Sequence, residues 1–406
     1  MSKTPKLRFK EFSGDWESKK LGDLGQSIIG LTYSPDDVVE NGTLVLRSSN
    51  IKNNKIVYTD NVFVNMDIQE KIITKENDIL ICSRNGSRAL IGKSALIDKS
   101  SENNTFGAFM TIFRAEQGKF VFQLLQTQKF FKQIHQNLGA TINQITSKDL
   151  NSMQFYIPSN EEQEKIASFF SLIDDKISFQ GEKVEALKDY KRGMMQKIFS
   201  RELRFKDDEG RDYPEWEEKK LGDIANLTSS KRVFASDYVD EGIPFYRGKE
   251  ITELKQNKKP NDILYITQEK YDDIKNNFGI PVKGDLLLTA VGTLGNSYVI
   301  KDDNPFYFKD GNLIWFKDIK EDVNFLNFIL TSEKGQKKII DSAIGSTQKA
   351  LTIVELNKLK YEFPSLKEQR KIAKFLNGLE SKVMKEQEKL DFLNEYKKGL
   401  LQQMFV

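Results

Sequence analysis

Short segments around glycine bring together side chains that can contact a nucleic acid. Arg84-Asn85-Gly86-Ser87-Arg88 follows a short apolar run, and a turn there displays two guanidinium groups and an amide. Arginine can form two hydrogen bonds with guanine and asparagine with adenine, while hydroxyl, ammonium and backbone N–H groups hold phosphate. For any single residue, an ordinary solvated loop is the simpler interpretation. The candidate DNA-contacting residues are Arg47, Asn50, Arg84, Asn85, Ser87, Arg88, Lys93, Asn143, Gln144, Arg247, Lys249, Thr293, Asn296, Gln348 and Lys349.

Residues suited to catalysis are scarce. A single cysteine (Cys82) and a single histidine (His135) exclude a disulfide scaffold and a Cys/His zinc site. Neither a G-x-x-x-x-G-K-[ST] phosphate loop nor a G-x-G-x-x-G turn occurs. Residues 303–306 lack the second proline of the amino-methyltransferase tetrapeptide, and residues 253–255 are an isolated E-x-K triplet, so both are interpreted as ordinary loop sequence. We expect no catalytic residue, metal or cofactor in this chain.

The composition describes a folded protein with balanced charge. Among 406 residues, 62 Lys and Arg stand against 59 Asp and Glu, a net charge of +3. This balance excludes a polybasic wrapper but leaves room for charged grooves. No stretch approaches the roughly 20 apolar residues of a membrane span. We therefore expect a soluble, cytoplasmic protein.

The chain is a tandem duplication. "LRFKEFSGDWESKKLGDL" (residues 7–24) returns as "LRFKDDEGRDYPEWEEKKLGDI" (203–224), and "IPSNEEQEKIASFF" (157–170) as "FPSLKEQRKIAKFL" (363–376). Between them, residues 78–97 loosely match residues 285–300, so the Arg84 turn has a counterpart at residues 292–296 that keeps the glycines and lacks the arginines. One turn with two sets of side chains is what two domains reading different sequences need.

Each copy ends in a heptad pattern. Apolar residues alternate four- and three-residue steps from Ile166 to Ile198 and from Ile372 to Met404. This is a coiled-coil seam, and each helix is expected to run ~58 Å. The helices are expected to pair antiparallel, because a parallel pair opposes Lys191 and Lys397; in the expected register Lys191 faces Glu386 and Gln180 faces Lys397. The seam comprises Ile173, Ile177, Gln180, Val184, Leu187, Lys191, Val383, Glu386, Leu390, Leu393 and Lys397. The alternative is two amphipathic helices, each packed on its own domain.

The expected fold class is α+β, with two mixed domains that each lead into a long helix. The domains are residues 1–157 and 201–363, and the helices are residues 158–200 and 364–406. Apolar runs at residues 44–51, 78–82 and 285–291 predict strands. The patterns at residues 120–136 and 324–341 predict helices.

This duplicated frame resembles the specificity subunit of type I restriction-modification systems. The resemblance rests on the two Pro–Glu–Gln–Ile–Ala helix entries, on T-x-x-x-x-T-x-x-x-L (residues 141–150) with a similar stretch at 347–356, and on W-E-x-K-K-L-G-D at Trp16 and Trp216. It covers essentially the whole chain. It implies a non-catalytic subunit with two target-recognition domains, each reading half of a bipartite, asymmetric site in double-stranded DNA, and a helix pair that sets the gap.

The resemblance also implies partners. Two methyltransferase (modification) subunits carry S-adenosylmethionine and methylate adenine, and motor-nuclease (restriction) subunits, with ATP and Mg²⁺, complete the restriction enzyme. Phe169 and Phe199 are candidate docking residues for the modification subunits.

Two other classes of function stay open. One is a coiled-coil scaffold with protein-binding globular ends, against which the Arg-, Asn- and Gly-rich loops weigh. The other is a nuclease or methyltransferase with an unusual site. The sequence gives neither the target bases nor the gap length.

Overall fold

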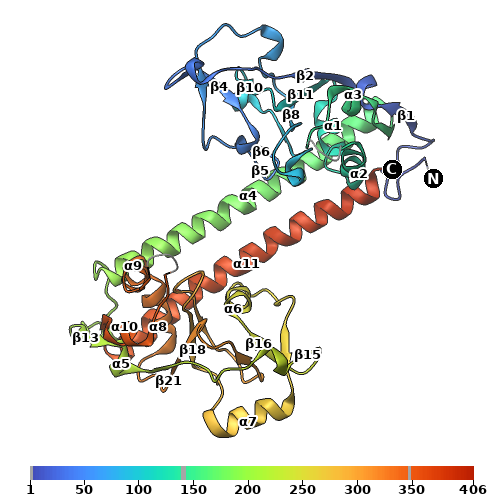
Figure 1. The fold of residues 1–406 in the computed structure, drawn as a ribbon. Coiled ribbons are helices and arrows are strands. Elements are labelled where there is room, and N and C mark those ends of the chain that lie inside the picture. Colours follow the sequence, from blue (N-terminus) through green and yellow to red (C-terminus); the bar gives the residue numbers. More distant parts are fainter. Residues whose placement is uncertain (1–2, 139–142, 346–348) are drawn as a thin grey trace. The chain divides into compact units, whose positions relative to one another are not determined.

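The computed structural model describes residues 3–138, 143–345 and 349–406 (Figure 1). The chain forms two compact units: unit 1 consists of Met1–Glu182 and Gln387–Val406, and unit 2 of Lys183–Glu386. Each unit combines an α+β globular part with a portion of both long helices, α4 (Asn160–Phe199) and α11 (Leu366–Met404). The expected fold class is therefore confirmed. No described helix is long and apolar enough to cross a membrane.

The globular part of unit 1 contains two four-stranded sheets. One has the order β2-β11-β8-β9 and is antiparallel throughout, and the other has the order β10-β4-β7-β3. Two smaller pairs, β1-β12 and β5-β6, complete it. The strands are β1 (Glu17–Lys20), β2 (Gly25–Ile29), β3 (Val38–Val39), β4 (Thr43–Leu46), β5 (Ile51–Lys52), β6 (Lys55–Ile56), β7 (Phe63–Val64), β8 (Ile79–Cys82), β9 (Ser94–Leu96), β10 (Thr105–Phe106), β11 (Met110–Ala115) and β12 (Gln154–Ile157). The short helices are α1 (Gly118–Leu124), α2 (Gln128–Asn137) and α3 (Ser147–Ser152).

Unit 2 repeats this plan. Its sheets have the orders β14-β21-β18-β19 and β15-β17-β16-β20, with β13 paired to β22. The strands are β13 (Glu217–Lys220), β14 (Asn226–Thr228), β15 (Tyr238–Val239), β16 (Ile243–Tyr246), β17 (Leu264–Ile266), β18 (Leu286–Thr289), β19 (Ser297–Val299), β20 (Tyr307–Phe308), β21 (Leu313–Lys317) and β22 (Lys360–Phe363). The helices are α5 (Leu221–Ile224), α6 (Gly248–Lys255), α7 (Gln268–Phe278), α8 (Val323–Thr331), α9 (Glu333–Asp341) and α10 (Ile353–Lys358).

Two predicted helices are each divided in two. Residues 120–136 fall in α1 and α2, and residues 324–341 in α8 and α9. Thr127 and Ser332 cause the breaks, because their hydroxyls accept hydrogen bonds from the Phe130 N–H (3.3 Å) and the Gly335 N–H (3.1 Å) and so begin a new helix. The predicted strand at residues 44–51 is also interrupted, by a 3-10 turn at Ser48–Asn50.

Each long helix begins with the same anchor. The Ser159 hydroxyl accepts a hydrogen bond from the Glu162 N–H at 3.4 Å, which caps α4. The buried carboxylate of Glu162 pairs with Arg8 at 2.7 Å, and in unit 2 Glu368 pairs with Arg204 at 3.0 Å. Both carboxylates lie in the first turn of a helix, where the helix dipole favours negative charge.

The ends of the long helices belong to the globular cores. Phe170 and Phe405 are buried in the core of unit 1, with ring centroids 6.1 Å apart. Ile198, Phe199 and Leu376 are buried in the core of unit 2. Phe199 is therefore core packing, which removes it as a candidate docking residue.

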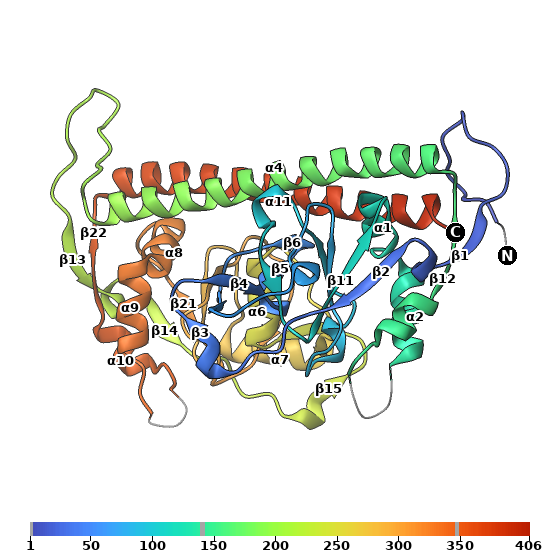
Figure 2. The same cartoon turned by 90° about the horizontal axis from the view of Figure 1, so that it is seen from above.

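Within each unit, the portions of α4 and α11 lie side by side and antiparallel, as the seam predicts (Figures 1 and 2). The expected register is wrong by one heptad. Lys191 forms an ion pair with Glu380, and Lys397 binds Asp174 at 2.6 Å. Counting along the heptads from these pairs, Lys191 lies level with Leu379 and Lys397 with Ile173.

The polar seam residues find partners beside the seam. Glu386 lies level with Val184, and its Oε2 forms an ion pair with the Nζ of Lys183 at 3.0 Å. A lysine has four methylenes, so it can cover an apolar neighbour and still place its ammonium on a flanking carboxylate. The polar residues of the seam therefore need not face one another. The expected register was chosen so that they would, and that reason no longer applies.

Candidate nucleic-acid interface

The first loop (residues 83–93) is held against two other chain segments. It follows β8, whose four residues are all buried. The N–H groups of Ser83 and Arg84 both donate to the Phe109 carbonyl, at 3.1 and 3.0 Å. Arg84 also forms an antiparallel bridge with Gln144. Residues 84, 109 and 144 are therefore fixed as neighbours by the backbone.

Unit 2 repeats this hydrogen-bond frame around the second loop (residues 290–296). The Ala290 N–H donates to the Asn312 carbonyl at 2.8 Å, as Ser83 does to Phe109 in unit 1. Val291 forms a bridge with Ala350, as Arg84 does with Gln144. The frame therefore aligns three pairs of positions at which the side chains differ: Arg84 with Val291, Phe109 with Asn312, and Gln144 with Ala350.

The other predicted residues of unit 1 gather around the first loop. The Asn85 amide donates to the Ser48 hydroxyl at 3.2 Å, and the Lys93 ammonium to the Ser48 carbonyl at 3.5 Å. The Asn143 amide donates to the Gly86 carbonyl at 3.0 Å. The Asn85 side chain also accepts from the Ser87 N–H at 2.9 Å. These contacts join residues 48, 85–87, 93 and 143 into one surface, and Ser48 is a member that was not a candidate.

Arg47 and Asn50 make contacts within unit 1. Arg47 donates to the Asp60 carboxylate at 2.8 Å. Asn50 is 0% exposed, and its amide donates to the carbonyls of Val57 and Thr59 at 3.1 and 3.2 Å. These bonds hold the segment between β4 and β7. Asn50 therefore stabilises the fold of unit 1 and is not part of its candidate DNA-contacting surface.

Arg247 makes similar contacts in unit 2. It binds the buried carboxylate of Glu250 at 2.6 Å and donates to the Asp262 carbonyl at 3.0 Å. The Asn296 amide donates to the Thr252 hydroxyl at 3.3 Å. Lys249, Thr293 and Lys349 are exposed. Gln348 lies outside the described residues.

The first loop is locally basic although the chain is nearly neutral. Residues 79–97 contain Arg84, Arg88 and Lys93 and no acidic residue, whereas residues 286–300 contain no charged residue. Within the described part of the chain, neither Arg84 nor Arg88 has a carboxylate partner. Arg88 donates to the His135 carbonyl at 3.4 Å, and the Arg84 guanidinium lies 4.9 Å from the centroid of the Phe109 ring. The two loops therefore offer a ligand different electrostatic environments.

Phe109 is a residue that the sequence did not point to. It is 57% exposed, and its ring carries the Arg84 guanidinium. An aromatic residue directly before the buried strand β11 is typical of core packing, so no sequence signal marked its exposure.

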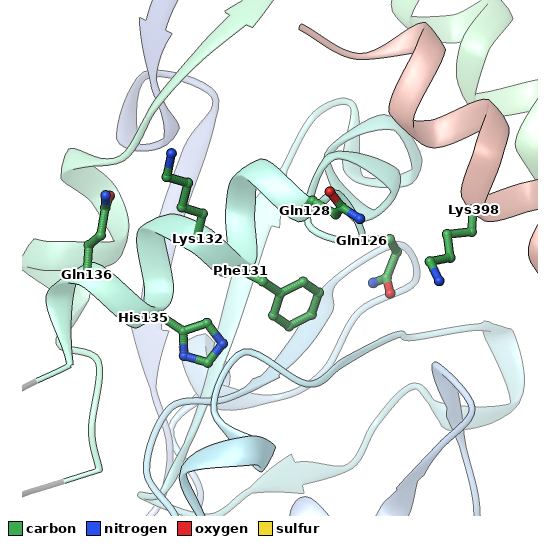
Figure 3. Close-up of a pocket in the computed structure, with 7 residues that line it drawn as sticks. All are labelled: Gln126, Gln128, Phe131, Lys132, His135, Gln136 and Lys398. Carbon is green, nitrogen blue, oxygen red and sulfur yellow. The ribbon is translucent and has the colours of Figure 1, made fainter. Parts of the chain in front are cut away.

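An open hollow of about 720 Å³ lies beside α2 in unit 1 (Figure 3). Phe131 and His135, one helical turn apart, direct their rings to the same side, and Lys398 reaches the hollow from α11 (Figure 3). Its lining is Gln126, Gln128, Phe131, Lys132, His135, Gln136 and Lys398, without an acidic residue. The lining is mostly apolar, and Lys398 pairs with Glu395 at 3.5 Å. Arg88 contacts the same helix through the His135 carbonyl.

Cys82 is not a nucleophile in this setting. It is buried at the end of β8, and burial raises the pKa of its thiol to about 11. The thiolate is the reactive form of cysteine, so the residue stays protonated and inert near neutral pH.

Comparison with known proteins gives a consistent picture. A family model described as the type I restriction modification DNA specificity domain matches residues 13–189 and 213–395. The type I restriction enzyme MjaVIII specificity subunit of Methanocaldococcus jannaschii is 26% identical to this chain, over 97% of this chain and 94% of that protein.

Solved structures share the fold. The crystal structure of the type I restriction-modification S subunit from M. genitalium gives a TM-score of 0.61 at 18% identity, covering 99% of both chains. A chain from a structure on complex assembly and conformational transition of the type I R-M system gives 0.55 at 15% identity, covering 97% of this chain and 98% of that one. Because the family model matches most of the sequence in two copies, the chain belongs to the family of the type I restriction modification DNA specificity domain.

Proposed function

We propose that this chain is the DNA-recognition subunit of a type I restriction-modification complex. Each unit reads one half of a bipartite, asymmetric site in double-stranded DNA. The observation that carries this proposal is the duplicated loop frame. One equivalent backbone hydrogen bond and one equivalent bridge in each unit present Arg84, Phe109 and Gln144 in unit 1 and Val291, Asn312 and Ala350 in unit 2. Two frames with different side chains suit two different half-sites.

The chemistry belongs to partner chains in this proposal. Two modification subunits bind S-adenosylmethionine and methylate adenine, and restriction subunits supply the ATP- and Mg²⁺-dependent steps. The chain's own part is to place those subunits on the right sequence. Its only thiol is buried and protonated near neutral pH, and its only histidine lies on α2 beside an open hollow, which supports a role in binding.

The test is adenine-methylation mapping by single-molecule sequencing in cells that express this chain with its modification subunit. Cells that express the modification subunit alone are the control. We expect a split motif with a fixed gap, methylated only when this chain is present. A stable complex that methylates no defined motif contradicts the proposal and favours a scaffold that binds proteins.

A further inference from the structure

We infer that the half-site read by unit 1 contains a guanine recognised by Arg84, that Phe109 positions this arginine, and that unit 2 has no equivalent contact. The inference rests on the proposed function and goes further by naming a base and the residues that select it. It also assigns different tasks to Arg84 and Arg88, the two arginines of the first loop.

The first step is the geometry of the pair. The Arg84 guanidinium lies 4.9 Å from the centroid of the Phe109 ring, and the backbone bond from the Arg84 N–H to the Phe109 carbonyl (3.0 Å) keeps the residues together. A guanidinium stacked on a ring by a cation–π contact leaves its edge N–H groups available. Those N–H groups form the fork that matches O6 and N7 of guanine in the major groove.

The second step is the absence of a competing acid. Arg47 and Arg114, in the same unit, bind Asp60 and Asp78 at 2.8 and 2.6 Å. Among the described residues, no carboxylate pairs with Arg84, and residues 79–97 hold no acid at all. An exposed, ring-supported arginine therefore keeps its hydrogen-bonding capacity for a ligand.

The third step separates base reading from phosphate binding. Arg88 donates to the His135 carbonyl at 3.4 Å, which directs it away from Phe109 and toward α2. Arg84 instead sits between Phe109 and the strand-like bridge to Gln144, whose amide is a second group able to address a base edge. We assign Arg88 to the backbone of the DNA and Arg84 to a base.

The fourth step is the comparison within the chain. The hydrogen-bond frame aligns Arg84 with Val291 and Phe109 with Asn312. A valine cannot form the guanine pair and an asparagine is no aromatic platform, so unit 2 must read its half-site by other groups. We therefore expect the two half-sites to differ at the base that this loop contacts.

The experiment is methylation mapping with the complete complex, comparing wild type with Arg84→Ala, Arg84→Lys, Phe109→Ala, Phe109→Tyr and Arg88→Ala. For Arg84→Ala we expect one guanine of one half-site to become degenerate, its preference over other bases falling roughly 5- to 150-fold. The other half-site keeps its sequence. Arg84→Lys keeps the charge and loses the fork, so it should relax the same position even if Arg84→Ala fails to fold.

Phe109 has its own signature as a positioning residue. Phe109→Ala should weaken the preference for the same guanine, by less than Arg84→Ala does. Phe109→Tyr keeps a ring and should keep the wild-type preference. Arg88→Ala should leave every base of the motif intact. An unchanged motif in both Arg84 variants, or a uniform loss of methylation without any degenerate position, overturns the inference. If wild type itself gives no split motif, the proposed function fails instead, so the two failures are distinguishable.

Discussion

An arginine in a loop does not by itself indicate a ligand contact, as a comparison of Arg47, Arg84 and Arg247 shows. All three follow or flank short strands, yet Arg47 and Arg247 bind acids of their own unit while Arg84 lies on an aromatic ring. The acid that occupies Arg47 is thirteen residues away, across a turn. The sequence therefore predicts where cations gather. Whether an acid of the same unit binds a given arginine depends on the fold, since Arg47 pairs with an acid thirteen residues away and Arg247 with one three residues away.

Asn50→Ala tests the structural assignment at this scale. Asn50 is fully buried and its amide serves the Val57 and Thr59 carbonyls, so removing it should lower the free energy of unfolding of unit 1 by about 1–3 kcal/mol. Chemical denaturation, with hydrogen exchange of residues 44–64, measures the loss. Ser49→Ala, at an exposed neighbour, is the control and should change little. Unchanged stability together with weakened DNA binding would contradict this assignment and indicate that Asn50 contacts DNA.

At the scale of elements, both long helices and their antiparallel pairing were predictable because the heptad repeat is a local signal. The register was not, because a slip of one heptad keeps the same residues in the seam and changes only which of them face each other. The choice then depends on Glu380 and Asp174, which lie outside the seam and bind Lys191 and Lys397. The divided helices have a similar cause, since Thr127 and Ser332 act as caps within continuous apolar patterns.

Cysteine cross-linking tests the observed register. Counting from the Asp174–Lys397 pair, Ile177 lies level with Leu393, so the double variant Ile177→Cys, Leu393→Cys should react rapidly with a short bis-maleimide. The pair Ile177→Cys, Leu400→Cys, level in the register displaced by one heptad, should not. The native Cys82 does not compete, because burial raises the pKa of its thiol to about 11. Mass spectrometry after proteolysis identifies the linked peptides, and the reverse pattern would reinstate the displaced register.

At the scale of the whole molecule, the net positive charge is small for a DNA-binding protein. Phosphate contacts dominate the affinity of most DNA-binding proteins, yet the net charge is +3 and the basic residues of the first loop are a local excess. Under the proposed function we therefore expect partner subunits to contribute to tight DNA binding.

One flank of the helix pair in unit 1 exposes several large apolar side chains, and we propose it as the docking site for the modification subunit. Leu172 and Phe179 of α4 are each 70% exposed, and Phe392 and Tyr396 of α11 stack at 6.2 Å with Phe392 68% exposed. Phe179 and Phe392 are level in the observed register, and their c positions place them on the same side of the pair. The globular part covers the opposite flank, where Gln123 binds Asp174 at 2.8 Å.

Phe179→Glu and Phe392→Glu should therefore each weaken binding of the modification subunit, roughly 30-fold or more, because buried aromatic anchors dominate interface energies and a carboxylate there is left without water or a partner. Asp175→Ala, at an exposed position of α4 that points away from the partner helix, is the matched control and should bind as wild type. Biolayer interferometry with the purified modification subunit gives the affinities, and hydrogen exchange checks that the helices stay folded. Wild-type affinity for both Glu variants would place the docking site elsewhere. Loss of binding should also abolish methylation at both half-sites together, because docking precedes any reading of sequence by the complex, whereas changes at Arg84 act on one half-site alone.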